Sequence, residues 1–116
     1  MTTITTQTLD PERSIGLVAV TGWLADEDAG RFRRALLAAA ETHFGLVVDL
    51  SQALDLTASA VGALAEAATV VRWRGGPWAV VAGGEVAARI SQAGLEAALN
   101  VLPDIDQAKK AVGLAD

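Results

Sequence analysis

The sequence predicts an α/β domain with a mixed sheet of four or five strands and about four helices. Strand-like and helix-like patterns alternate along the chain after an opening pair of strand patterns. Two strand patterns, residues 44–50 and 78–82, are almost entirely apolar, which is typical of strands buried on both faces of a parallel sheet. The chain has 116 residues, of which 52% are hydrophobic, enough for one domain with its own core. We therefore expect residues 1–116 to form a single domain.

The first two strand patterns predict an antiparallel hairpin. Residues 3–9 are rich in Thr and Ile with rough alternation, as in an edge strand. Asp10 and Pro11 suit the first two positions of a turn. Residues 15–21 (IGLVAVT) form the second strand, which we expect to end at Gly22.

Two long helices are predicted, over residues 26–40 and 59–73. The first begins with three acidic residues, which favour a helix N-terminus, and the second stops before the Gly-Gly-Pro of residues 75–77. Each has an apolar stripe at helical spacing. We expect the arginines at positions 31, 33 and 34 to form a solvated face of the first helix, and Trp73 and Trp78 to cover one end of the core. The predicted stripes are Ala29, Phe32, Leu36 and Ala39 or Ala40 in the first helix, and Val61, Leu64, Ala65, Ala68 and Val71 in the second.

Shorter elements complete the chain. They are a helix over residues 85–93 with Val86 and Ile90 inward, a short strand over residues 99–102, and a closing helix over residues 104–112.

Composition excludes several classes of function. The net charge of −5 and the pI of about 4.7 are unsuited to nucleic-acid binding, which needs clustered basic residues. Cysteine is absent, and His43 has no partner spaced for metal ligation, so we expect no metal site and no cofactor. The first residues are polar, without the basic start and apolar core of a signal peptide, so we expect none, and no apolar run is long enough to insert into a membrane. We therefore expect a cytoplasmic protein.

The sequence does not favour an enzyme. A hydrolase triad needs a histidine beside a nucleophilic serine, and no serine lies in a G-x-S-x-G elbow. No phosphate-binding glycine motif follows a strand. A carboxylate cluster of Asp49, Asp55 and Glu66 is disfavoured because Glu66 lies off the apolar stripe of its helix.

The most informative segment lies between the strand at residues 44–50 and the helix that follows. After a polar turn, the hydroxyl residues Thr57 and Ser59 stand where the helix begins. A helix N-terminus favours an anion through its free N–H groups and its dipole. Ser59 could therefore carry a phosphate, or Ser59 or Thr57 could simply cap the helix.

Four motifs in the right order resemble the STAS family, the sulfate-transporter and anti-sigma-factor-antagonist domain. The resemblance spans nearly the whole chain. The motifs are residues 22–24 (GWL) for a G-x-L element, residues 46–51 (LVVDLS) for a strand ending in D-L-S, residues 57–64 (TASAVGAL) for D-S-S-G-L-G-x-L, and Gly94-Leu95 with Val101 and Ala108 for the G-L…V…A tail.

The resemblance implies a STAS-like fold and a partner-switching regulator. In antagonist members of the family, the helix-opening serine is phosphorylated by an anti-sigma factor that is a serine kinase. The unmodified form binds that kinase and releases the sigma factor. Carried over by position, the phosphorylation site is Ser59. We expect the partner surface to include this segment and the nearby Trp23, that is, Trp23, Asp55, Thr57, Ala58, Ser59 and Gly62.

The chain departs from the family pattern in three places. Thr57 stands where an acid is common, Ala58 replaces the first serine, and Ala60 replaces a glycine. Ala60 would add a methyl group beside the acceptor and restrict the backbone. These departures leave an alternative in a different class. Some stand-alone STAS proteins support an ATP-driven lipid transporter by binding its ATPase subunit, without phosphorylation.

Trp23 leaves two interpretations open. It either packs on the first helix, or it is exposed as a binding hot spot next to the loop that precedes Ser59. A third class of function, a small-ligand binder, would use a groove near Trp23 and Ser59.

Overall fold

A computed structural model describes residues 2–114. The elements in chain order are β1 (Thr3–Asp10), β2 (Ile15–Leu24), α1 (Asp26–Thr42), β3 (Gly45–Leu56), α2 (Ala58–Trp73), β4 (Trp78–Val81), α3 (Gly84–Gln92), β5 (Val101–Leu102) and α4 (Ile105–Ala111). Over residues 2–114, the mixed five-stranded sheet and the four helices confirm the predicted fold class.

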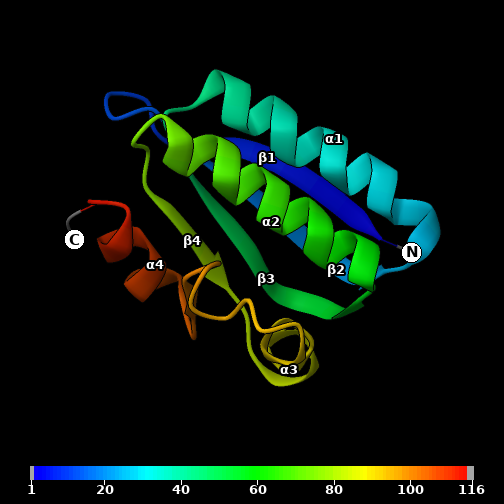
Figure 1. Ribbon diagram of the computed structural model, residues 1–116. Helices are drawn as coiled ribbons and strands as arrows, with labels where there is room; N and C mark the ends of the chain where they lie inside the picture. The colour runs from blue at the N-terminus through cyan, green and yellow to red at the C-terminus, as the bar shows by residue number, and fades with distance from the viewer. Residues whose placement is uncertain (1, 115–116) are drawn as a thin grey trace.

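The strands lie in the sheet in chain order, β1-β2-β3-β4-β5. β1 pairs antiparallel with β2, as the predicted hairpin requires, and the other neighbours are parallel. The apolar strand β3 lies at the centre, with α1 and α2 crossing in front of the sheet (Figure 1). The order follows from two crossovers, β2-α1-β3 and β3-α2-β4, that place both long helices on the same face.

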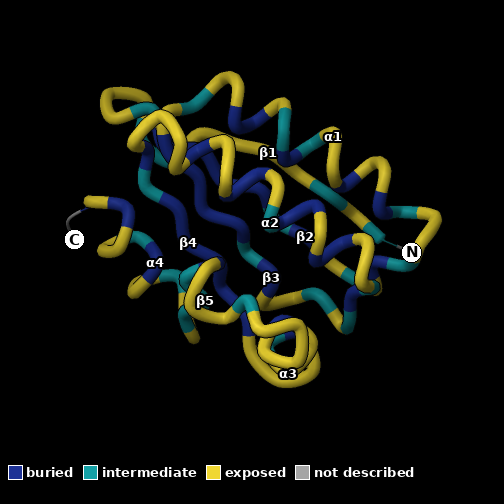
Figure 2. The backbone as a smooth tube through the Cα atoms, in the orientation of Figure 1, coloured by how far each residue is buried: buried dark blue, intermediate teal, exposed yellow. Residues whose placement is uncertain are grey.

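Side chains of the strands alternate between two apolar clusters, one on each face of the sheet. The larger cluster lies under α1, α2 and α3, and the smaller one lies under α4. Buried segments therefore run along β3 and β4, while the helices expose their outer faces (Figure 2). The larger cluster includes Val18, Leu46, Val48 and Val80, and the smaller one includes Leu17, Val47, Ala79 and Val81.

The predicted apolar stripes of both long helices face the sheet. In α1, Phe32 and Leu36 are fully buried, and in α2 all predicted stripe residues are buried except the half-buried Ala65. At the surface, Arg33 of α1 donates two hydrogen bonds to the carboxylate of Glu66 in α2, at 2.8 and 2.7 Å. Exposed pairs of this kind contribute little to stability, so burial of the stripes holds these helices to the sheet.

The later elements follow the prediction with shifted ends. In α3 the predicted inward residues, Val86 and Ile90, are buried. β5 has only two residues. α4 begins after Asp104, whose carboxylate caps it by accepting a hydrogen bond from the Gln107 amide at 2.9 Å.

The predicted ends of the second and third strands are wrong. β2 continues past Gly22 to Leu24, and β3 continues past Leu50 to Leu56 through the predicted polar turn. Within the described part of the chain, β3 pairs beyond Asp49 only with β2, because β4 ends opposite that residue. The two extensions form a two-stranded ribbon, which we call the arm (residues 21–24 and 52–56). Polar residues are tolerated there because, among the strands of residues 2–114, none pairs with the outer side of β3 beyond Asp49.

The prediction for Trp73 is also wrong, whereas that for Trp78 is confirmed. Trp78 is buried and its indole N–H donates to the Leu99 carbonyl at 3.0 Å. Trp73 is 90% exposed. Val71 is the inward residue of the last turn of α2. A residue two positions later points to the opposite side of a helix, so Trp73 faces solvent.

Candidate functional site

The arm aims Trp23 away from the core. The pairing of β2 with β3 shifts register twice, between Ala19 and Thr21 and between Gly22 and Trp23. Gly22 has φ of +99°, a conformation that favours glycine. In the second shift Leu54 is the extra residue on β3, between the partners of Gly22 and Trp23. Trp23 is 54% exposed and Leu54 is 72% exposed, so the interpretation that Trp23 is buried against α1 is wrong.

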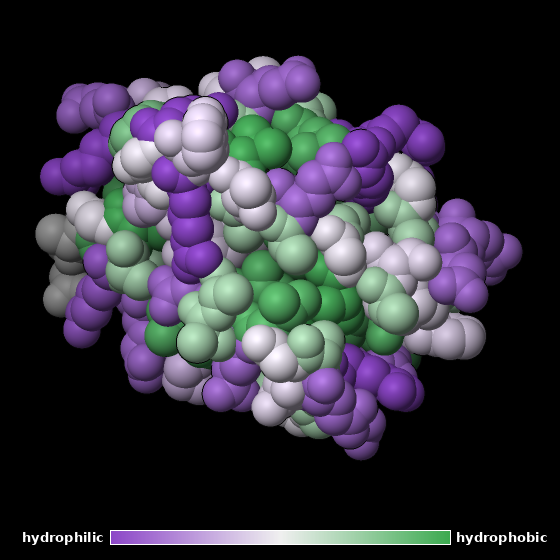
Figure 3. Space-filling model, viewed as in Figure 1, coloured by the Kyte–Doolittle hydropathy of each residue, from purple (hydrophilic) through white to green (hydrophobic). Residues whose placement is uncertain are grey.

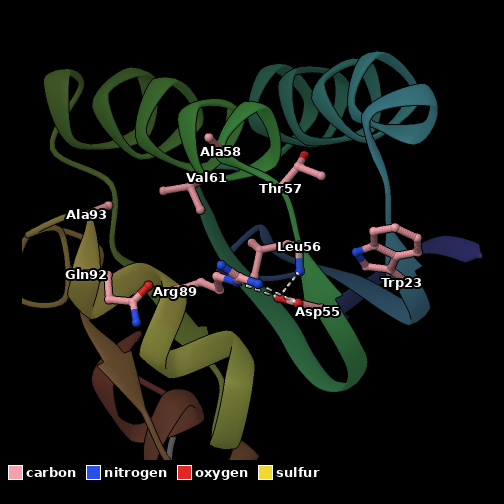
Figure 4. Close-up of a pocket in the computed structure, with 9 residues that line it drawn as sticks. All are labelled: Trp23, Asp55, Leu56, Thr57, Ala58, Val61, Arg89, Gln92 and Ala93. Atoms are coloured by element: carbon pink, nitrogen blue, oxygen red, sulfur yellow. Dashed lines mark hydrogen bonds and ion pairs between the residues drawn. The ribbon is translucent and has the colours of Figure 1, made fainter.

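A groove of about 460 Å³ lies between the arm, the start of α2 and α3. Trp23 lies on one side of Asp55 and the side chains of α3 on the other (Figure 4). Apolar side chains gather between α2 and α3, with hydrophilic side chains around them (Figure 3). The groove thus combines an apolar floor with a polar rim, a common form for binding sites. The residues that line it are Trp23, Asp55, Leu56, Thr57, Ala58, Val61, Arg89, Gln92 and Ala93.

An ion pair between α3 and the arm forms part of the lining of this groove. Arg89 of α3 donates to both carboxylate oxygens of Asp55, each at 3.1 Å, and the amide of Leu56 donates to Asp55 Oδ1 at 2.8 Å. The hydrogen bonds from Arg89, followed by that from Leu56, lower the pKa of the Asp55 carboxyl below its usual value. The same pairing raises the pKa of Arg89. The two bonds align the two planar groups with each other, while the buried Val86 and Ile90 hold α3 to the core.

We expect the pKa of Asp55, measured by NMR titration of its carboxyl carbon, to rise in the Arg89→Met variant. The amide of Leu56 should keep it partly lowered. Because the pKa is lowered in the folded state, Asp55 stabilises the fold above the unfolded-state pKa, and this contribution is lost as pH falls through the folded-state pKa.

The matched control is Arg33→Met, which removes an equivalent two-bond pair with Glu66 elsewhere on the surface. It should raise the pKa of Glu66 and leave Asp55 unchanged. An unchanged Asp55 pKa in Arg89→Met would contradict the assigned pairing.

The start of α2 separates the roles of the two hydroxyl residues. Thr57 is the N-cap: its hydroxyl accepts from the Ala60 amide at 3.4 Å. Ser59 is the second residue of the helix and is exposed. Of the two capping candidates, the structure therefore selects Thr57. The first turn has no acidic residue, so the positive end of the dipole beside Ser59 carries no carboxylate of its own helix.

The methyl group of Ala60, expected from the sequence to lie beside Ser59, points into the core instead. Ala60 is fully buried, and its methyl group belongs to the core rather than to the surface that carries Ser59. Gly62 is exposed, and a Cβ atom there would meet nothing within 4 Å. The structure therefore brings Trp23, Asp55, Thr57 and Ala58 together in the groove, while Ser59 and Gly62 lie on the adjoining outer surface of α2.

Sequence reasoning missed the residues that α3 contributes to the groove, Arg89, Gln92 and Ala93, and the exposed Leu54 of the arm. A signal for Arg89 was present, because helical periodicity places it beside the inward Val86 and Ile90. No local signal pairs it with Asp55, which is 34 residues away in the chain.

Within residues 2–114, no group of three or more His, Asp or Glu side chains is arranged to hold a metal ion. In the same part of the chain, no helix has the length and apolar character needed to cross a membrane. Asp49, Asp55 and Glu66 do not form a cluster in the structure, since Asp55 is paired with Arg89 and Glu66 with Arg33.

Comparison with solved structures finds close matches over almost the whole chain. The crystal structure of an anti-sigma factor antagonist from Mycobacterium paratuberculosis has a TM-score of 0.86 and 26% identity, and the match covers 97% of this chain and 94% of that one. A candidate anti-sigma factor antagonist from Thermotoga maritima has a TM-score of 0.82 at 16% identity, with 94% and 93% covered.

The same fold occurs within a much larger protein. The murine anion transporter Solute Carrier 26 family member A9 matches with a TM-score of 0.68 at 19% identity, and the match covers 92% of this chain and 21% of that one. Identities this low show the fold alone. A search of curated proteins finds no match. The family model of the STAS domain, however, matches residues 8–108, and the chain therefore belongs to the STAS domain family.

Proposed function

We propose that this chain is a regulatory protein-binding module of the anti-sigma factor antagonist type. Its partner is an anti-sigma factor with serine-kinase activity, and it acts in the cytoplasm without a cofactor or a catalytic activity of its own. The observation that carries the proposal is the exposed indole of Trp23 at the rim of a groove that the start of α2 also lines. The 26% identity to the Mycobacterium antagonist over nearly the full chain supports the same class.

The proposed partner surface joins the groove to the outer side of α2. It comprises the six residues expected from the sequence, Trp23, Asp55, Thr57, Ala58, Ser59 and Gly62, with Leu54 and Arg89 added. Large aromatic side chains next to small ones suit a protein contact, because the indole supplies buried area and the small residues allow a helix or loop to approach closely. The Asp55–Arg89 pair adds a charged, hydrogen-bonded edge to this surface.

We further propose that Ser59 is phosphorylated by the partner. Its exposure at the second position of α2 supports access by a kinase, and the buried methyl group of Ala60 leaves that access open. A phosphate there adds a charge of roughly −1.5 to −2. The free N-terminal amides and the dipole of α2 would stabilise that charge in the free protein.

The alternative is an accessory subunit of an ATP-driven lipid transporter, bound to its ATPase subunit. The observation that favours it is the departure from the family motif at Thr57 and Ala58, where the acid and the first serine are replaced. In this case the same surface would bind without modification.

The proposed function is tested with purified candidate anti-sigma kinases of the source organism. We expect one kinase to bind the unmodified chain in calorimetry and, with ATP, to add one phosphoryl group, seen as an intact-mass shift that peptide sequencing places at Ser59. The Ser59→Ala variant should bind but stay unmodified. Binding to a transporter ATPase subunit, with no kinase binding, would instead support the accessory-subunit alternative.

A further inference from the structure

A free sheet edge runs along β1, on the side away from β2. In an antiparallel pair, alternate residues of an edge strand point their N–H and C=O groups away from the neighbouring strand. Within residues 2–114, no side chain is hydrogen-bonded to the backbone of Thr3–Leu9, and β2 is the only strand that pairs with β1. Most of β1 is exposed along its length (Figure 2). Its outer backbone groups are therefore available for pairing.

This edge lacks the features that normally prevent strands of two molecules from pairing. Residues 3–9 contain no charged residue and no proline, and the register shift of β1 lies at its far end, between Thr8 and Asp10. Natural edge strands are usually protected by lysine, proline, a bulge or short length. The opposite edge, β5, follows that rule, since it has two residues.

One side of α1 lies beside this edge. Arg31 of α1 donates to the Thr2 carbonyl at 3.0 Å, and Thr42 bonds the ring of His43, which in turn contacts the Thr8 hydroxyl. The second turn of α1 thus lies near the start of β1, and the C-terminal end of α1 lies near the end of β1. Helical spacing places Ala35 and Ala38 between them on that side. The small side chains at these two positions allow a neighbouring helix to come close, with the exposed Arg34 beside them.

We propose that β1 pairs antiparallel with β1 of a second copy of this chain, which joins the two sheets into one. Two identical antiparallel strands are related by a two-fold axis, so the contact closes as a dimer. Two copies of a chain with a net charge of −5 repel each other. Residues 3–9 carry no charge, so pairing along this segment brings no like charges into contact. Thr-Thr pairs near the axis add cross-strand hydrogen bonds.

The two faces of β1 indicate which side chains would meet. Ile4 packs on the cluster under α1 and α2, and Leu9 packs on the cluster under α4. By alternation, Thr5 and Gln7 share the face of Leu9, and both are exposed. Substitutions at these two positions therefore change the cross-strand contact without entering the core.

The test is sedimentation velocity over a concentration series, which needs no other partner. Wild type is expected to form a dimer, and the Thr5→Lys/Gln7→Lys variant to raise the dimer Kd by about tenfold or more, since like charges then face each other across the axis. An equal mixture of that variant with Thr5→Glu/Gln7→Glu should restore dimers that neither variant forms alone. A Ser51→Lys/Thr69→Lys control places the same charge away from the edge and should keep the wild-type Kd.

Either of two results would overturn the proposal: a wild-type chain that stays monomeric up to millimolar concentration, or a dimer that the lysine pair does not weaken. A monomer would leave β1 as an edge for a strand of another protein. Thermal unfolding of each variant checks that the fold is retained. Because the β1 edge lies outside the groove, this result and that of the kinase-binding test are independent.

Discussion

Replacing Trp23 with alanine is expected to weaken binding of the protein partner by about 2 kcal/mol or more, about thirtyfold in Kd. The indole is 54% exposed in the free chain, next to the more exposed Leu54. Burying a large indole at the centre of an interface is the usual origin of a binding hot spot. Calorimetry with the purified partner gives the change in Kd. The same variant should unfold at nearly the wild-type temperature, because Trp23 is absent from both apolar clusters.

The chain offers a matched control in Trp73. This residue is 90% exposed and lies at the end of α2, whereas the groove adjoins the start of that helix. Trp73→Ala removes the same side chain from the surface and should leave partner binding unchanged. Leu54→Ala should weaken binding by a smaller amount than Trp23→Ala. Equal Kd values for wild type, Trp23→Ala and Trp73→Ala would show that the arm is not part of the partner surface.

The parts of the fold that the sequence predicted are those with a strong apolar period. Phe32 and Leu36 marked the inner face of α1, and the apolar run at residues 44–50 marked the central strand. In α1 the burial of one face leaves a repeat of about 3.6 residues, and in β3 the burial of both faces leaves a nearly continuous apolar run. The identity and order of the elements followed from these patterns.

The arm could not be predicted in the same way. Ser51 and Gln52 are polar and were expected to form a turn, but in the structure they continue β3. The Ser51 amide donates to Asp49 Oδ1 at 2.9 Å, and Gln52 pairs with Thr21 of β2, so this part of the strand has no need of apolar side chains on both faces. This part of β3 forms because it pairs with a distant segment, β2, and the local sequence preference does not indicate such pairing.

The residues of the groove also divide into those that the sequence predicted and those that it did not. Thr57 and Ala58 were found because a helix start is a local feature with its own sequence signature. The pairing of Arg89 with Asp55 depends on how α3 packs beside the arm, which no short-range pattern records. The exposure of Trp23 depends on the register shift at Gly22, so composition alone left both interpretations open.

The last prediction concerns Ser59. The Ser59→Asp variant should bind the partner about a hundredfold more weakly than wild type, and Ser59→Ala should bind as wild type does even after incubation with the kinase and ATP. A carboxylate at this position loses its water when the partner docks and gains no cation from its own helix. Leaving a charge unpaired in an interface costs about 3 kcal/mol or more. Wild type treated with kinase and ATP should lose affinity as Ser59→Asp does.

Stability measurements separate this switch from helix capping. Thr57 is the cap, so Thr57→Ala should lower the free energy of unfolding by about 1 kcal/mol. Ser59→Ala should change it by less, and Ser59→Asp should be neutral or slightly stabilising, because an acidic group in the first turn interacts favourably with the dipole.

Thr69→Asp places the same charge on the exposed side of α2, two turns or more beyond Ser59, and should keep the wild-type affinity. Equal affinity for the wild type and the Ser59→Ala and Ser59→Asp variants, with each folded, would rule out phosphorylation as the switch. Unmodified binding of the kind expected for a transporter accessory subunit would then be the better account of this surface.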